Sequence, residues 1–138
     1  MATPLLCLLG YALWAILLVL YVGGQRAFQV VTGKQAPNAF PSGVQHGSDA
    51  YWRANRAHIN TTENLPIYGA VVVAGMLAHA DSSRFAMLAV TALAARVVQS
   101  LIHLSSGSVM AVNLRFSAFC VQLGCLIAMA IEIVLPSA

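Results

Sequence analysis

Charged residues are scarce in this sequence and are missing altogether from its first segment. Only 8% of the 138 residues are charged, whereas a soluble domain typically carries about a quarter. Residues 1–25 contain no Asp, Glu, Lys, Arg or His, and about 20 apolar residues suffice to cross a bilayer. A cleaved secretion signal would require a basic residue before this apolar run, and the sequence has none there. The composition therefore excludes an ordinary soluble domain and predicts a permanent membrane-spanning helix at the N-terminus.

Cysteine and clustered basic residues are scarce as well. Cys7, Cys120 and Cys125 lie in apolar stretches without CxxC spacing, so we expect neither a disulfide framework nor a bound metal. Small buried apolar side chains are the expected role of all three. The net charge of +3 comes from scattered residues, which argues against a nucleic-acid-binding surface.

The apolar segments and the breaks between them predict a single all-α domain, an integral membrane bundle of four helices. The expected helices cover residues 4–31, 48–79, 83–104 and 110–135. Leu65–Ala78 is too short to cross about 30 Å of hydrocarbon, so the second helix must extend upstream into polar residues. Ser48 or Asp49 would be its N-cap. Short turns at 81–83 and 105–108 favour an antiparallel bundle of sequential neighbours.

Basic residues are unequally divided between the two ends of such a bundle. Those beside the first and third connections are Arg26, Lys34, Arg53, Arg56 and Arg115, whereas Arg84 alone lies beside the second. The positive-inside tendency therefore places the first and third connections in the cytoplasm and both termini on the opposite side.

Ionisable side chains also lie at or near membrane depth. Each charge that faces lipid at the bilayer centre costs about 2.5–3.5 kcal/mol on insertion scales, so these groups must face one another, water or a ligand. Together with neighbouring polar and aromatic residues they recur at helical spacing at one end of the bundle. The residues are Arg53, Arg56, Asn60 and Glu63 in the second helix, Arg96, Gln99, Ser100 and His103 in the third, and Arg115, Phe119 and Gln122 in the fourth. Three polar faces that meet, with more arginine than carboxylate, predict a basic pocket for an anionic ligand. A simpler interpretation is that the arginines only lie at the membrane interface and that Arg56 pairs with Glu63.

Three of these segments together resemble one family of membrane proteins. Residues 53–66 (RANRAHINTTENLP), 95–103 (ARVVQSLIH) and 113–119 (NLRFSAF) resemble the second, third and fourth helices of the membrane-associated proteins in eicosanoid and glutathione metabolism, the MAPEG family. The first segment carries the pattern Arg-Ala-His/Gln-x-Asn-x-x-Glu from Arg56 to Glu63. The resemblance extends over nearly the whole chain in the number and order of helices.

This resemblance implies a homotrimer that binds glutathione between adjacent subunits, near the cytosolic face. It assigns Arg56, Asn60 and Glu63 to the peptide and terminal groups of glutathione. Further contacts would come from Arg96 and His103 in the third helix and Arg115 in the fourth. Arg26 or Arg53 would add positive charge at the mouth of the site.

The same resemblance implies an activity. By analogy with eicosanoid-producing members, Arg115 would be the catalytic residue that activates the thiol of glutathione. The expected protein is a membrane glutathione transferase or glutathione-dependent peroxidase that needs no metal. Its second substrate would be a hydrophobic electrophile or a lipid hydroperoxide that arrives through the membrane lipid.

Other functions stay open at the level of the sequence. Ile59, Gln99, His103 and Phe119 stand where prostaglandin-synthase-like members have Arg, His, Tyr and Tyr, so prostaglandin isomerase activity is not expected. A non-catalytic membrane scaffold, or a lipid- or glutathione-binding protein of the same fold, remains an alternative. A bis-histidine haem site at His58 and His103 has no other support in the sequence. A proton-coupled transporter that uses Glu63 or Glu132 fits an arginine-rich pocket poorly, and Glu132 is expected to be an interfacial residue.

Overall fold

Four long helices make up most of the chain. The structure is a computed structural model that describes residues 2–41, 43–80 and 82–135. The helices are α1 (Thr3–Val31), α2 (Asp49–Leu77), α3 (Ser83–Ser105) and α4 (Val109–Val134). Three of them, α1, α3 and α4, are long and apolar enough to cross a membrane, judged by length and composition. The all-α membrane fold is therefore as predicted, and α2 differs from the other three because its first half is polar.

Three of the helices have a serine as their N-cap. The hydroxyls of Ser48, Ser82 and Ser108 accept hydrogen bonds from the backbone N–H three residues later, at 3.2, 2.9 and 3.2 Å. Each bond satisfies a donor that the first helical turn leaves free. Ser48 is thus the N-cap of α2, one of the two residues expected there. Asp81, in the turn predicted at 81–83, and Pro136, which follows the predicted fourth helix, lie outside the described residues.

The ends of α1 and α2 share a second kind of cap. After α1, Gly33 adopts a left-handed φ of 69°, and the N–H of Lys34 returns to the carbonyl of Gln29 at 2.9 Å. After α2, His79 takes the left-handed position with φ of 56°, and the N–H of Ala80 returns to Gly75 at 2.8 Å. These are Schellman motifs, which satisfy carbonyls of the last turn and reverse the chain direction.

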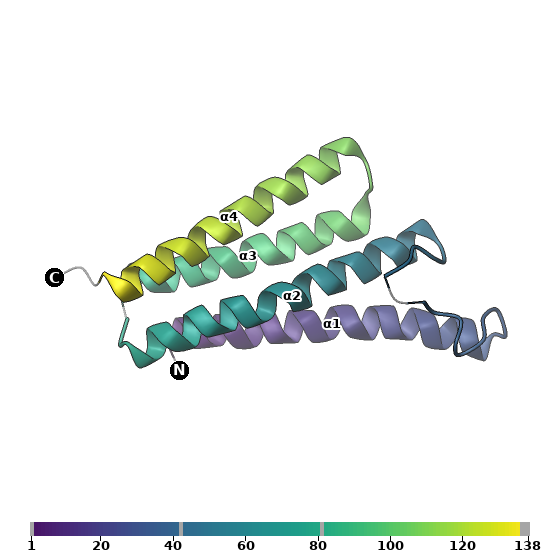
Figure 1. Cartoon of the computed structure of the whole chain (residues 1–138), viewed down its shortest axis with the longest axis horizontal. Coiled ribbons are helices and arrows are strands. Elements are labelled where there is room, and N and C mark those ends of the chain that lie inside the picture. The colour runs from purple at the N-terminus through teal and green to yellow at the C-terminus, as the bar shows by residue number, and fades with distance from the viewer. Residues whose placement is uncertain (1, 42, 81, 136–138) are drawn as a thin grey trace.

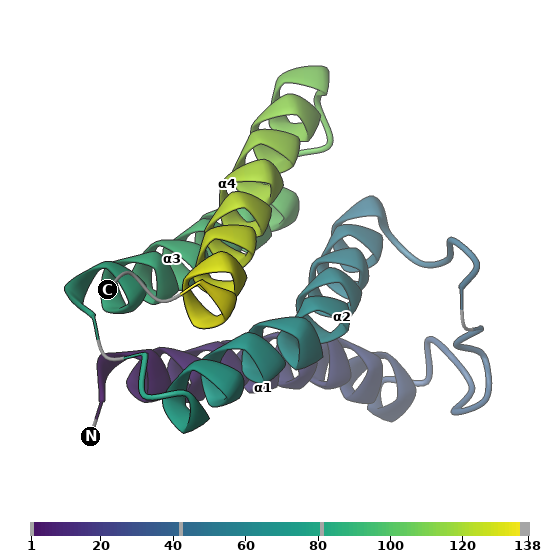
Figure 2. The same ribbon diagram turned by 60° about the vertical axis from the view of Figure 1, so that its left-hand side comes forward.

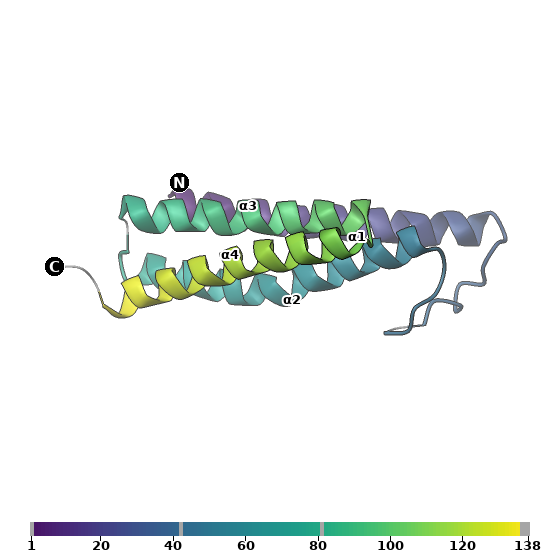
Figure 3. The ribbon, with the colours of Figure 1, turned by 90° about the horizontal axis from the view of Figure 1, so that it is seen from above.

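The helices form two layers, and the pair α3–α4 spreads away from the pair α1–α2 toward one end of the bundle, the open end (Figure 1). Figure 3 shows α1 and α3 in one layer and α2 and α4 in the other. Helix α3 packs against the other three helices. Helix α1 begins and α4 ends at one end of the bundle, and the connections 32–48 and 106–108 lie at the other (Figure 1). Figure 2 shows that α2 changes direction along its length, as expected for a helix with Pro66 in its interior.

Close helix packing holds the end of the bundle where the chain begins. Tyr11, Tyr68, Phe85 and Met129, one from each helix, are fully buried in a single apolar cluster. The ring of Phe85 fits against Gly75, where a β-carbon would lie 2.2 Å from the ring. Van der Waals packing of this kind is the main force between helices in lipid, because lipid tails are as apolar as the helices.

The cysteines divide between this interior and the surface. Cys7 and Cys125 are buried, as predicted, and both belong to the apolar cluster. Cys120 is exposed, so its predicted burial was wrong. The apolar sequence around Cys120 did not indicate burial, because a membrane helix also carries apolar residues on its lipid-facing surface.

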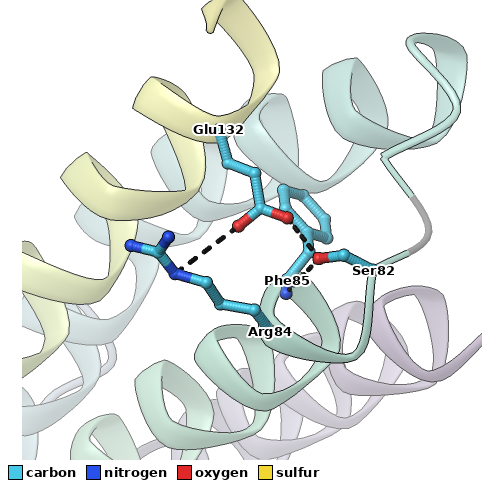
Figure 4. A network of polar contacts seen from close by, with 4 residues as sticks. All are labelled: Ser82, Arg84, Phe85 and Glu132. Atoms are coloured by element: carbon cyan, nitrogen blue, oxygen red, sulfur yellow. Dashed lines mark hydrogen bonds and ion pairs between the residues drawn. The ribbon is translucent and has the colours of Figure 1, made fainter. Parts of the chain in front are cut away.

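A small polar network fastens the same end of the bundle. Glu132 of α4 accepts a hydrogen bond from the hydroxyl of Ser82 and pairs with Arg84, its Oε2 3.9 Å from the Arg84 Nε (Figure 4). Its side chain is only 11% exposed, against 68% for Arg84. Glu132 therefore joins the end of α4 to the start of α3, far along the bundle from the predicted basic pocket.

Candidate functional site

A basic cavity of about 520 Å³ lies at the open end of the bundle. It is lined by residues of α2, α3 and α4 and of the short connection between α3 and α4. The lining residues are Trp52, Arg53, Arg56, Asn60, Gln99, His103, Gly107, Val112, Arg115, Phe116 and Phe119. We call this space the basic cavity. Its volume is in the range of pockets that bind small molecules.

Five of the eight predicted site residues meet in the basic cavity, and helical geometry explains why. Arg53, Arg56 and Asn60 follow one another on one face of α2, at spacings of three and four residues. His103 comes from the last turns of α3 and Arg115 from the second turn of α4. The short connection between α3 and α4 brings these two helix ends together, so residues far apart in the sequence line one space.

The electrostatics of the basic cavity are one-sided. Three guanidinium groups line it, and none of the described residues contributes a carboxylate. The imidazole of His103 lies within the field of Arg115, Arg56 and Arg53. The Nε of Arg53 donates to the carbonyl of Leu104 at 3.5 Å, which leaves its terminal nitrogens for other partners. Guanidinium groups bind carboxylates and phosphates in a fork-like geometry, so this arrangement suits an anion.

Apolar side chains surround Arg115 on the α4 wall of the basic cavity. Val112, Phe116 and Phe119 come from α4, and together with Arg115 they fall at positions i, i+3, i+4 and i+7, one face of a helix. Val112 and Phe116 were missed in the sequence, although their spacing from Arg115 was a usable signal. The site therefore places an apolar surface beside a cationic one.

Glu63 does not line the basic cavity. It lies on α2, seven residues after Arg56, and its side chain is exposed. Among residues 2–41, 43–80 and 82–135 the ion pair within 4.0 Å is that of Arg84 and Glu132. Arg56 and Glu63 are therefore not paired, and the simpler interpretation in which they neutralise each other was wrong.

Arg26 lies in a different space. Its Nε donates to the hydroxyl of Tyr51 at 2.6 Å, and its guanidinium stands 5.4 Å from the ring centroid of Phe40. It lines a second cavity of about 280 Å³ between α1, α2 and the connection 32–48, together with His58. Within one subunit, Arg26 therefore lines a different cavity, whereas it was expected at the mouth of the basic cavity.

Arg96 lies behind the basic cavity instead of in it. The side chain is 1% exposed and is packed among α1, α3 and α4, near the phenol of Tyr11. Gln122 reaches the same phenol, with its Nε2 3.5 Å from the hydroxyl. The spacing of Arg96 in α3 predicted its direction toward the bundle, but not that Gln99, one turn later, would line the cavity while Arg96 does not.

These features define an integral membrane helical bundle with a basic cavity at one end of its interior. The MAPEG family model matches residues 4–135, which is nearly the whole chain. The chain therefore belongs to the MAPEG family, as its second, third and fourth helices indicated. No curated protein matches the chain.

Proposed function

We propose that this protein binds glutathione in the basic cavity and activates its thiol toward hydrophobic substrates, as a membrane glutathione transferase or a glutathione-dependent peroxidase. The observation that carries this proposal is the convergence of Arg53, Arg56 and Arg115 on one cavity to which no described residue contributes a carboxylate. Membership in the MAPEG family, named for eicosanoid and glutathione metabolism, supports it.

Glutathione suits the chemistry of this cavity. The tripeptide carries two carboxylates, which pair well with guanidinium groups, and peptide groups that a carboxamide such as that of Asn60 can bind. Arg53 and Arg56 are assigned to the carboxylates because both lie on the α2 wall of the cavity. The apolar wall formed by Val112, Phe116 and Phe119 is assigned to the second substrate, which reaches the site through the membrane.

Arg115 is the proposed catalytic residue. A free thiol has a pKa of about 8.5, and only its thiolate is a good nucleophile. Lowering that pKa by two units requires about 2.7 kcal/mol of preference for the charged form, which a guanidinium in a poorly hydrated site can supply. Arg115 shares one face of α4 with Val112, Phe116 and Phe119, so a sulfur beside it would lie next to the second substrate.

The chemistry then needs no metal and no covalent intermediate on the protein. The thiol proton leaves to solvent, and the sulfur forms a bond to an electrophilic carbon as the leaving group departs with its electron pair. With a hydroperoxide, the sulfur takes the terminal oxygen and the alcohol is released. A second glutathione then reduces the sulfenic acid, giving glutathione disulfide and water.

We also propose that the protein acts as a homotrimer, with the first and third connections on the cytoplasmic side. Glu63 is exposed midway along α2, and an ionised carboxylate at that depth is costly against lipid. Contact with a second subunit would cover it. The same contact would allow Arg26 and Glu63, which lie outside the basic cavity of their own subunit, to reach glutathione held between subunits.

A glutathione-binding scaffold without catalysis is the alternative. Tyrosine is absent from the lining of the basic cavity among the described residues, where His103 and Phe119 stand instead. The experiment that separates the two functions compares glutathione binding with turnover of chlorodinitrobenzene by the purified protein. Binding together with turnover supports the enzyme, whereas binding without turnover of any electrophile or hydroperoxide supports the scaffold.

A further inference from the structure

The most deeply buried charge in the described part of the chain lacks a charged partner. Arg96 is the largest side chain that is fully buried, and its Nε and Nη2 atoms have no hydrogen-bond partner. No carboxylate of the described residues lies within 4.0 Å of it. A guanidinium stays protonated in proteins, and an isolated buried charge is strongly unfavourable. Arg96 therefore needs an acceptor oxygen, an anion or both.

Gln99 offers the matching group. It follows Arg96 by one turn on the same face of α3, and its Oε1 is buried without a hydrogen-bond partner. The side chain is only 8% exposed, yet it lines the basic cavity. The structure contains no hydrogen bond between the two side chains, since the Gln99 Oε1 and the Arg96 Nε and Nη2 all lack partners. A guanidinium has donors only, so a carboxamide that turns toward Arg96 would offer its oxygen and keep its NH₂ group for the cavity.

We propose that Arg96 is a positioning residue that acts on the basic cavity through Gln99. The guanidinium fixes and polarises the carboxamide, so that the Gln99 NH₂ becomes a preorganised, strengthened donor toward the sulfur of glutathione. Hydrogen bonds in series strengthen one another in a low-dielectric interior. This inference rests on the proposed function and assigns a role to a charge that does not touch the ligand.

The buried position of Arg96 distinguishes it from the other cations. Arg53, Arg56 and Arg115 line the cavity with His103, so solvent and ligand both contact them. On the interior side, the groups near Arg96 are the phenol of Tyr11 in α1 and the carboxamide of Gln122 in α4. Both are neutral, so the charge of Arg96 is not cancelled. Its effect should fall on the protonation of the sulfur more than on the overall affinity for glutathione.

The test is a pH titration of the ultraviolet thiolate absorbance of bound glutathione, with intact protein in detergent. We expect Gln99→Met and Arg96→Met to raise the pKa of the bound thiol by about one unit, because each breaks the series of hydrogen bonds. Arg96→Lys keeps the charge and should stay within about 0.3 units of the unmodified protein. Glutathione affinity should change by less than about threefold.

Gln122→Met is the matched control, because Gln122 is buried to 1% exposure, has an unpartnered Oε1 and does not line the cavity. It should alter thermal stability without moving the thiol pKa. If Arg96→Met does not fold, Gln99→Met still tests the proposal with the guanidinium in place. An unchanged thiol pKa in Gln99→Met, or an equal shift in Gln122→Met, would overturn the role of Arg96 and leave the proposed function standing. A wild-type protein without any thiolate signal would instead overturn the proposed function itself.

Discussion

The hydroxyls of Thr61 and Ser100 lie 3.2 Å apart and join α2 to α3 inside the bundle. The Thr61 hydroxyl also lies 2.8 Å from the carbonyl of Ala57 and the Ser100 hydroxyl 2.9 Å from that of Arg96, so the two hydrogens are shared among three contacts; both side chains are buried. Their neighbours in sequence, Asn60 and Gln99, line the basic cavity. This contact between helices therefore sets how α2 and α3 face each other directly beside the cavity.

Replacement of Thr61 by valine should weaken this junction. Thr61→Val keeps the shape of the side chain but removes the hydroxyl, and a buried hydrogen bond contributes about 1 kcal/mol. We expect a lower melting temperature in detergent. Thr91→Val is the control, because Thr91 is exposed and its hydroxyl bonds only within its own helix, to Met87. Equal melting temperatures for the two variants would show that the contact does not stabilise the bundle.

A methyl group at Gly75 should disrupt the packing of α2 on α3. The β-carbon of Gly75→Ala would lie 2.2 Å from the Phe85 ring, and overpacking typically destabilises by about 1–3 kcal/mol. Gly69→Ala, in the same helix, would meet Leu8 at an ordinary 3.5 Å and should be neutral or stabilising. The double variant Gly75→Ala/Phe85→Leu should recover part of the loss in melting temperature. Loss of stability in Gly69→Ala, with none in Gly75→Ala, would contradict this packing.

Removal of Arg56 should weaken glutathione binding. Arg56→Ala deletes one of the guanidinium groups of the basic cavity, and charge-assisted hydrogen bonds contribute more than neutral ones. We expect the Kd for glutathione to rise about tenfold by isothermal titration calorimetry. Arg84→Ala removes the same charge at the opposite end of the bundle, where Arg84 pairs with Glu132, and should leave the Kd within about twofold. Equal effects would point to net charge instead of a site.

Removal of Arg115 should reduce turnover more than binding. If Arg115 stabilises the thiolate, Arg115→Ala should lower kcat by about 100-fold, as the loss of one electrostatic donor commonly does. The Kd for glutathione should rise by less than about tenfold, because Arg53 and Arg56 still line the cavity. Arg115→Lys, which restores a charge without the fork of donors, should recover part of the rate. Unchanged turnover in Arg115→Ala would assign thiol activation to another residue.

Much of the fold followed from composition and helix periodicity. The uncharged first segment, the breaks between the apolar segments and the N-cap expected at Ser48 or Asp49 placed each helix end within two residues of its position in the structure. The polar faces of α2, α3 and α4 also predicted which helices share a pocket. Helical spacing fixes which side chains lie on one face, and short connections fix which helices are neighbours.

The sequence did not predict how deeply each polar side chain is buried within the bundle. Arg96 and Arg115 both lie on polar faces, yet Arg96 is buried and does not line the cavity, whereas Arg115 does. Arg26 bends toward Tyr51 instead of the cavity. These differences depend on helix rotation and rotamer choice, which are set by tertiary packing and which a pattern of residue types does not encode. Glu63 is exposed within one subunit, so its place depends on contacts beyond the single chain.

The most direct test of the central claim is the ultraviolet thiolate absorbance of glutathione titrated into detergent-purified protein at neutral pH. Free glutathione is mainly protonated there, because its thiol pKa is about 8.5. The proposed site predicts a saturable thiolate signal on binding, which is consumed when chlorodinitrobenzene is added. The absence of a saturable signal in folded protein would contradict glutathione activation and would direct the search for the ligand of the basic cavity to other anions, lipid headgroups first.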